Sequence, residues 1–277
     1  MSLTVEVAGK SDIGCVRKNN EDNLGWDQKL GLYVVCDGMG GALAGEVASK
    51  MGVELLLDYF RHGDETGKYP DFGDAPPDAS PTGRHLASAI HRANAAIYEA
   101  GQAKQSQRGM GSTVVSLVIK QNFLTIAHAG DSRIYRLRDG VLEQLTQDHS
   151  LVMEQVRRGL ITPEQAEKSD MQNIIIKALG SEDKVEPDIQ DLIAFRDDIY
   201  VLATDGLTKL VKDDSIKAIL LNSPSLDGAC EDLISAAKQN GGEDNVTCLL
   251  LRVVEEPWYR KLYHFLLGGG QSWRNSS

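Results

Sequence analysis

The distribution of apolar residues predicts strands first and helices after them. Residues 3–8 and 32–36 are rich in β-branched and aromatic side chains, which is typical of strands. From Glu46 to Phe60 apolar residues recur every four positions, which predicts a helix, and a spacing of three or four from Leu86 to Ile97 predicts another. The stretch between them, about residues 61–84, is rich in Gly, Pro, Asp and Ser and is expected to be an exposed, mobile loop.

The middle of the chain is rich in expected strands, at residues 113–119, 123–129 and 133–137. Asp139-Gly140 follows the last of them. This pair is a strong signal for a type I′ hairpin, because both central residues of that turn need a positive φ.

The remainder is mostly helical. A helix is expected from Ser150 to Gly159, and Thr162-Pro163-Glu164-Gln165 is typical of a new helix start with a capping box. Further elements are expected after this start: a strand at 199–204, helices at 213–222 and 226–239, and a last strand at 246–254. Strands and helices do not alternate strictly, so the order favours an α+β fold with two sheets between helical layers.

Composition and charge narrow the class of protein. The chain has 277 residues, of which 42% are hydrophobic, and its 29 basic and 40 acidic residues give a net charge of −11. That charge argues against nucleic-acid binding. The four cysteines are scattered, and no signal peptide or long apolar run is visible. We expect a soluble cytoplasmic protein with one domain over residues 1–254, in which Cys36 is a small core residue rather than a nucleophile.

Carboxylates recur in turns along most of the chain. Glu21 and Asp22 lie in a polar run, Asp37 and Asp205 each end an apolar strand before a glycine, and Asp244 precedes Asn245. Asp131 also ends an expected strand. One Asp-Gly pair is ordinary turn chemistry. If the fold brings the set together, however, it forms an oxygen-lined site that suits Mg²⁺ or Mn²⁺ rather than softer metals.

Such a site predicts phosphoryl chemistry. Two cations bridged by one carboxylate activate a water and hold both ends of an in-line displacement. A phosphate substrate also favours a planar cation with bidentate geometry, and Arg17, four residues before Glu21, is placed to supply it.

At this point the chain resembles a known family over about residues 5–254. Eight motifs occur in the order found in the metal-dependent (type 2C) Ser/Thr protein phosphatases, and the compact chain is most similar to the bacterial stand-alone form. The motifs are Asp12-Ile13-Gly14-x-x-Arg17-x-x-Asn20-Glu21-Asp22, Asp37-Gly38-Met39-Gly40-Gly41 with Gly45-Glu46, Gly111-Ser112-Thr113, Gly130-Asp131-Ser132-Arg133, Asp148-His149-Ser150, Ala178-Leu179-Gly180, Thr204-Asp205-Gly206 and Asp244-Asn245.

The resemblance implies a four-layer α-β-β-α sandwich with two central, mainly antiparallel sheets. It also implies Mn²⁺ or Mg²⁺, two ions per site and a weaker third in bacterial members. Asp37 would bridge the two metals and the Gly38 carbonyl would bind one of them, while Asp205 and Asp244 would hold the other. Asp131 with Asp205 matches the third site.

The implied roles of the remaining site residues are more indirect. Glu21 and Asp22 would act through metal-bound waters, Arg17 would bind phosphoryl oxygens, and Asn245 would orient the substrate or a water. Residues 148–178 match a flap beside the active site.

The implied activity is hydrolysis of phosphoserine and phosphothreonine in proteins by a metal-bridging hydroxide, opposing a bacterial Ser/Thr kinase. The expected partners are phosphorylated proteins, and the expected state is a monomer. Two alternatives remain: a catalytically silent module that binds phosphoproteins, and a phosphatase dedicated to one regulator.

The chain departs from the family at the general acid. Eukaryotic relatives carry a histidine, proposed as the general acid, at the position of Met39. Many bacterial relatives carry one directly after the Gly-Gly pair, where this chain has Ala42. His149 or a water on the third metal could donate the proton instead, although a structural role is expected for His149, so the acid stays unassigned.

A tail at residues 255–277 follows the expected domain. It is aromatic and basic, and we expect it to pack on the domain or to be a tail that orders readily, rather than to be a helix that binds a membrane surface or a partner.

Overall fold

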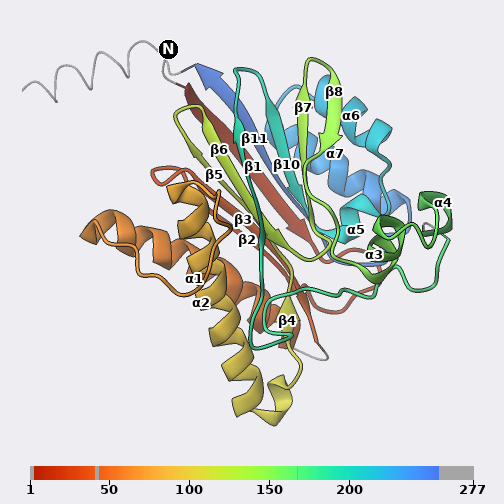
Figure 1. Cartoon of the computed structure of the whole chain (residues 1–277). Helices are drawn as coiled ribbons and strands as arrows, with labels where there is room; N and C mark the ends of the chain where they lie inside the picture. The colour runs from red at the N-terminus through yellow and green to blue at the C-terminus, as the bar shows by residue number, and fades with distance from the viewer. Residues whose placement is uncertain (1–2, 41–43, 167, 256–277) are drawn as a thin grey trace, which may run out of the picture.

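The computed structural model describes residues 3–40, 44–166 and 168–255. Two antiparallel sheets form its centre (Figure 1). The first sheet has the strand order β1 (Leu3–Asp12), β11 (Val246–Glu255), β10 (Ile199–Ala203), β7 (Arg133–Arg138) and β8 (Val141–Gln144).

The second sheet lies against the first. Its strand order is β2 (Asp22–Asp27), β3 (Leu32–Met39), β5 (Val114–Lys120), β6 (Phe123–Ala129) and β9 (Asp188–Ile193), and the short β4 (Gly111–Ser112) also pairs with β3.

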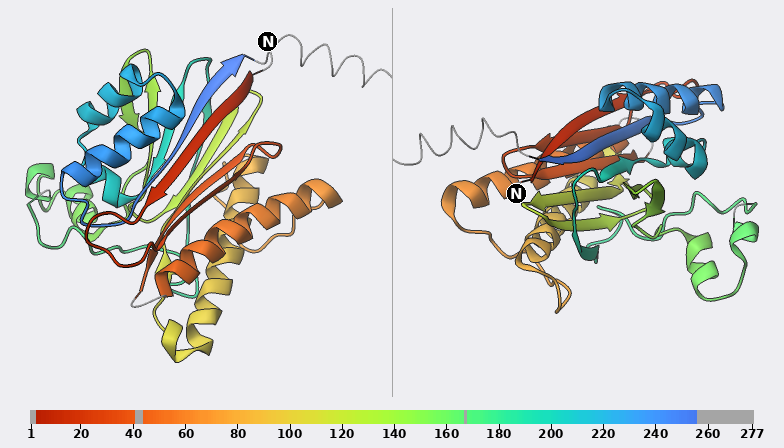
Figure 2. Two further views of the ribbon diagram at one scale, coloured as in Figure 1. Left: turned by 180° about the vertical axis from the view of Figure 1, so that it is seen from behind. Right: turned by 90° about the horizontal axis from the view of Figure 1, so that it is seen from above.

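Helices cover the outer face of each sheet. Figures 1 and 2 show α1 (Ala44–Thr66) and α2 (Pro81–Ala103) on one side of the strands, and α6 (Asp213–Asn222) and α7 (Leu226–Gln239) on the other. Short helices lie in the connections: η1 (Gln105–Gln107), α3 (Leu151–Arg157), α4 (Pro163–Ala166) and α5 (Asp205–Thr208). The α+β fold with two antiparallel central sheets is confirmed.

The four layers follow from strands that are buried on both faces. In β3, Leu32, Val34 and Cys36 pack with the core beneath α1 and α2, while Tyr33 and Val35 pack between the two sheets. Successive side chains of a strand point to opposite faces, so an unbroken apolar run serves two cores. Strand β10 divides in the same way, because Val201 contacts the core under α7 and Tyr200 contacts the core between the sheets.

Several local predictions are confirmed. Helices α6 and α7 have the expected bounds. Asp139 and Gly140 have φ of 49° and 73°, as the type I′ hairpin requires. The capping box also forms: the Gln165 N–H donates to Thr162 Oγ1 (3.3 Å) and the Thr162 N–H donates to Gln165 Oε1 (2.8 Å).

Other elements differ from the expectation. Helix α1 continues to Thr66, so the connection to α2 is shorter than predicted, and it is tied down by a hydrogen bond from Tyr59 Oη to the Pro70 carbonyl (2.8 Å). Strands β2 and β9 were not predicted. In the part of the chain that the structure describes, no helix is long and apolar enough to cross a membrane. The expected tail lies outside the described residues, apart from Glu255 at the end of β11.

Candidate metal centre

The predicted carboxylates gather at one end of the two sheets. A cleft of about 680 Å³ opens there, and its wall includes Asp37 at the end of β3, Asp205 at the start of α5, and Asp244 just before β11. Its other walls include Arg17, Glu21, Gly38, Met39, Asn173, Lys209 and Asn245.

The backbone of Asp37 is held rigidly. Its N–H donates to Thr113 Oγ1 (3.0 Å), and its carbonyl accepts from the Thr113 N–H (2.8 Å) and from Ser112 Oγ (2.9 Å). Thr113 Oγ1 in turn lies 2.7 Å from Ser132 Oγ, beside Asp131. The hydroxyl groups of Ser112, Thr113 and Ser132 therefore hold the backbone around Asp37 and Asp131 in place.

Asp22 lies opposite Asp37 in the pairing of β2 with β3. Thr204 Oγ1 donates to Asp22 Oδ2 (2.9 Å), which joins the second sheet to the end of β10. The other oxygen, Asp22 Oδ1, is buried and has no hydrogen-bond partner, and Asp131 Oδ1 is in the same situation. A buried carboxylate oxygen without a partner is costly, so both atoms indicate that cations belong here.

The electrostatics of the cluster point the same way. Burial raises the pKa of Asp37 far above its usual value, and the negative charges of Asp22, Asp205, Asp131 and Asp244 add to this effect. Burial is also the main cause that raises the pKa of Asp22 and of Asp131 to about 7, and the charge of Asp205 contributes to both. The carboxylates can all be ionised near neutral pH only if positive charge is brought in. The residues therefore fit divalent cations.

Two basic side chains contact the outer carboxylates. Arg17 Nη2 donates to Asp244 Oδ2 (2.7 Å), and its side chain is half exposed at the mouth of the cleft. Lys209 Nζ lies 2.6 Å from Asp205 Oδ2 and 3.8 Å from Asp131 Oδ2. Arg17 was predicted to lie at this site, whereas Lys209 was not. Its position four residues after Asp205, on the same side of a helix, was the available signal.

Tight backbone packing explains the glycines of this region. A Cβ on Gly38 would lie 2.1 Å from the Gly45 carbonyl oxygen, and a Cβ on Gly45 would lie 2.7 Å from Glu21 Oε2. The Glu21 carbonyl accepts hydrogen bonds from the Gly38 N–H (3.1 Å) and Ser49 Oγ (2.5 Å). Glu21 is thus packed directly against the turn that carries Asp37.

Asn245 is placed differently from our expectation of a residue that orients substrate. Its side-chain NH₂ donates to the carbonyls of Ile13 (3.0 Å) and Asn19 (2.9 Å), and its Oδ1 accepts from the Glu21 N–H (2.8 Å). Both amide hydrogens are therefore used inside the protein, and the residue is buried. This geometry argues against phosphate binding and favours a role in fixing the loop that carries Arg17 and Glu21.

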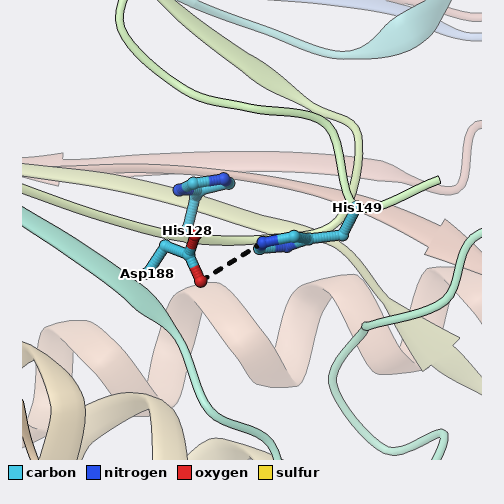
Figure 3. A group of neighbouring side chains, drawn as sticks. All are labelled: His128, His149 and Asp188. Carbon is cyan, nitrogen blue, oxygen red and sulfur yellow. Dashed lines mark ion pairs between the residues drawn. The ribbon is translucent and has the colours of Figure 1, made fainter. Parts of the chain in front are cut away.

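The side chain of His149 is also engaged inside the protein. Its Nδ1 accepts from the Gly130 N–H (3.1 Å), and its Nε2 lies 3.3 Å from Asp188 Oδ1 (Figure 3). It does not line the cleft. Nδ1 holds the turn before Asp131 and Nε2 faces Asp188 of β9, so the expected structural role accounts for this histidine. Met39 does line the cleft, but a thioether has no proton to donate. Ala42 lies outside the described residues.

His128, His149 and Asp188 are close enough to suggest a second metal site, as Figure 3 shows. The two rings are stacked, with an interplanar angle of 1° and centroids 4.6 Å apart. Lone pairs of ring nitrogens lie in the ring plane, so parallel stacked rings cannot direct them at one ion. Burial also lowers the pKa of His128 to about 4, and Lys177 already pairs with Asp188 (2.8 Å). The group is better explained as a pair of stacked rings that supports the Gly130 turn.

Comparisons with known proteins agree with this geometry. The family model "Protein phosphatase 2C" matches residues 15–250. The serine/threonine phosphatase stp of Listeria innocua is 38% identical over 245 residues, which cover 87% of this chain and 93% of that protein. Protein phosphatase PhpP of Streptococcus pneumoniae is 34% identical over 260 residues, with coverages of 91% and 99%.

Solved structures show the same fold. The Mycobacterium tuberculosis serine/threonine phosphatase PstP/Ppp matches with a TM-score of 0.79 at 34% identity, over 91% of this chain and 99% of that one. A catalytic domain of PstP, solved in complex with two manganese ions, matches with a TM-score of 0.76 at 35% identity, over 92% and 100%.

These similarities and the carboxylate-lined cleft define a metal-dependent Ser/Thr protein phosphatase. The chain belongs to the protein phosphatase 2C family, as the sequence motifs predicted.

Proposed function

We propose that this phosphatase hydrolyses phosphoserine and phosphothreonine in proteins at the cleft, with two divalent ions, Mn²⁺ or Mg²⁺, held between Asp37, Asp205 and Asp244. The observation that carries the proposal is the convergence of buried carboxylates around Asp37, with unpartnered oxygens on Asp22 and Asp131. When bound, the ions supply an activated water as nucleophile and positive charge for the phosphoryl oxygens.

Asp37 is proposed to hold both ions. Burial raises its pKa and the charges of four other carboxylates add to this effect, so cations beside it would favour its ionised form. Its backbone bonds to Thr113 keep the strand end in place, and the Gly38 carbonyl beside it is proposed to bind one ion. Asp205 and Asp244 approach from the other sheet and would hold the second ion.

Arg17 is proposed to receive the phosphate. Its guanidinium lies at the mouth of the cleft against Asp244, where it remains half exposed. A planar guanidinium matches two phosphoryl oxygens in bidentate geometry. Asn245 is proposed as a positioning residue, because it fixes the Ile13 and Asn19 carbonyls on either side of Arg17.

The segment 148–178 contributes Asn173 and Ile175 to the wall of the cleft. We propose that it contacts the protein substrate beside the phosphorylated residue. The opposing enzyme is proposed to be a Ser/Thr kinase, because its products carry the phosphate that this site removes.

The test is phosphate release from a phosphothreonine peptide, with Mn²⁺ or with EDTA, by the wild type and by Asp205→Asn. We expect release that needs Mn²⁺ and is lost in the variant. Asp214→Asn, an exposed carboxylate of α6, is the control and should retain activity. Peptide binding without turnover in saturating Mn²⁺ would instead indicate a silent binding module.

A panel of kinase-phosphorylated proteins tests the substrate range. Release from several of them supports a general antagonist of a kinase, whereas turnover of a single protein would indicate a dedicated phosphatase.

A further inference from the structure

The ammonium of Lys209 lies between two carboxylates of the metal centre. Its Nζ is 2.6 Å from Asp205 Oδ2 and 3.8 Å from Asp131 Oδ2. The Lys209 N–H also donates to the Asp205 carbonyl (2.8 Å), so a single turn of helix places the two side chains on one face. The helical turn therefore fixes the position of the Lys209 ammonium relative to Asp205.

A third oxygen completes the surroundings of the ammonium. Asn173 Oδ1, from the segment 148–178, accepts a hydrogen bond from Lys209 Nζ at 2.6 Å. An ammonium has three hydrogens, and two of them are used by Asp205 and Asn173. The third is left for the side of Asp131, and the lysine side chain is mostly buried.

Asp131 needs this positive charge. It is only 4% exposed, and its Oδ1 has no hydrogen-bond partner. Among the described residues, Lys209 is the basic side chain that the structure pairs with it. A buried carboxylate can stay ionised when a cation is close, and here the Lys209 ammonium is such a cation.

The charge balance of the centre agrees with two divalent ions. With metal bound, the seven carboxylates of the cleft and of the buried cluster behind it would carry seven negative charges, and the three basic groups of the described cleft wall carry three positive charges, which leaves four negative charges. Two divalent ions would neutralise these four. The carboxylates are Glu21, Asp22, Asp37, Asp131, Asp205, Glu243 and Asp244, and the basic groups are Arg17, Lys18 and Lys209.

We propose that the Lys209 ammonium takes the cation position between Asp131 and Asp205, so that this phosphatase binds two divalent ions and excludes a third. The proposal rests on the two-ion site proposed above. An ammonium and a divalent ion repel each other, and they compete for the same carboxylate oxygens. Lys209 is thus a positioning residue that replaces an ion otherwise taken from solution.

The experiment counts bound metal and does not depend on turnover. The full chain is freed of metal with EDTA, dialysed and titrated with Mn²⁺, while the free ion is followed by electron paramagnetic resonance. The wild type should saturate at two ions. Lys209→Met and Lys209→Gln, which remove the charge, should each bind a third, weaker ion. Lys209→Arg, which keeps the charge, and Lys212→Met, an exposed lysine nearby, should bind two.

A second substitution identifies the position of the extra ion. Asp131→Asn added to Lys209→Met should return the count to two, because it removes a carboxylate oxygen from the vacated position. Far-UV circular dichroism confirms that each variant is folded, and the second uncharged variant provides the count if one of them is not.

Three ions in the wild type, or two ions in both uncharged variants, would overturn the role of Lys209 and leave the proposed function intact. A wild type that binds no Mn²⁺ would overturn both.

Discussion

The metal-free protein should lose stability as the pH rises, because folding forces carboxylates into a shared buried site. Asp22 has a pKa of about 7 in the folded chain, against 3.8 as its usual value, and burial is the main cause. A carboxyl group whose pKa is raised by folding holds its proton more tightly in the folded state. Its contribution is therefore most favourable below about pH 4, declines as the pH rises, and levels off above about pH 7.

The magnitude follows from the size of the shift. Each pH unit inside this window costs about 1.4 kcal/mol for one such group. Between about pH 5 and pH 7, Asp22 alone therefore removes about 2.3 kcal/mol from the free energy of unfolding, because the slope decreases as the pH approaches the folded-state pKa. Asp131 is shifted in the same direction for the same main reason. The two carboxylates share neighbours, so we use the value for one of them as the expected effect.

Urea denaturation in EDTA, at about pH 5 and pH 7, measures the effect directly. We expect a lower urea midpoint at the higher pH in the wild type. Asp22→Asn keeps the shape of the side chain and removes its proton equilibrium, so its pH dependence should be smaller. Asp214→Asn, with its exposed side chain, should behave as the wild type. A metal-free wild type equally stable at both pH values would refute the reasoning.

Mn²⁺ should reverse the trend. The ion binds the ionised carboxylates, so its affinity should increase as the pH rises through about 7. A site filled at a free concentration about 100 times its Kd stabilises the folded chain by about 2.7 kcal/mol, which is enough to offset the loss from Asp22. Unfolding in saturating Mn²⁺ should therefore show little or no decrease in stability from pH 5 to pH 7.

Three further predictions concern single substitutions. Gly38→Ala should lower the free energy of unfolding by about 1–3 kcal/mol and weaken Mn²⁺ binding in a calorimetric titration, because its Cβ would lie 2.1 Å from the Gly45 carbonyl oxygen. Asp198→Ala should lower the free energy of unfolding in urea by about 3–5 kcal/mol, because Arg138 pairs with the buried Asp198 at 2.7 Å and would lose this partner. A loss below about 1 kcal/mol would contradict this expectation. Arg17→Lys should raise KM by about tenfold in steady-state assays with a phosphopeptide, because an ammonium lacks the bidentate geometry; an unchanged KM would remove Arg17 from the phosphate site.

Much of the local structure could be predicted from the sequence. The apolar run at residues 32–36 indicated a strand, and the structure then buries both of its faces in two separate cores. The Thr162 capping box and the Asp139-Gly140 hairpin formed as expected, because a few adjacent residues determine both. The carboxylates of the cleft were also visible, since each ends an expected strand or lies in a polar or glycine-rich turn.

Elements with weak local patterns were missed. Strand β2 is short and mostly polar, with Asp22 at one end and Asp27 at the other, and β9 is an edge strand with exposed residues. Neither shows the apolar alternation that predicts a strand. Pairing with β3 and β6 decides their structure, and a pairing partner does not appear in a local window.

By itself, the sequence determined which residues end the strands, where the helices begin, and which side chains can hold a hard cation. Only the tertiary structure decided what surrounds each of those side chains. In the folded chain the side-chain amide of Asn245 donates to backbone carbonyls, and the His149 ring accepts from the Gly130 N–H. The Lys209 ammonium lies beside Asp131. The physical reason is that hydrogen bonds and charges act through space, and the partners of Asn245 are separated from it by more than 220 positions along the chain.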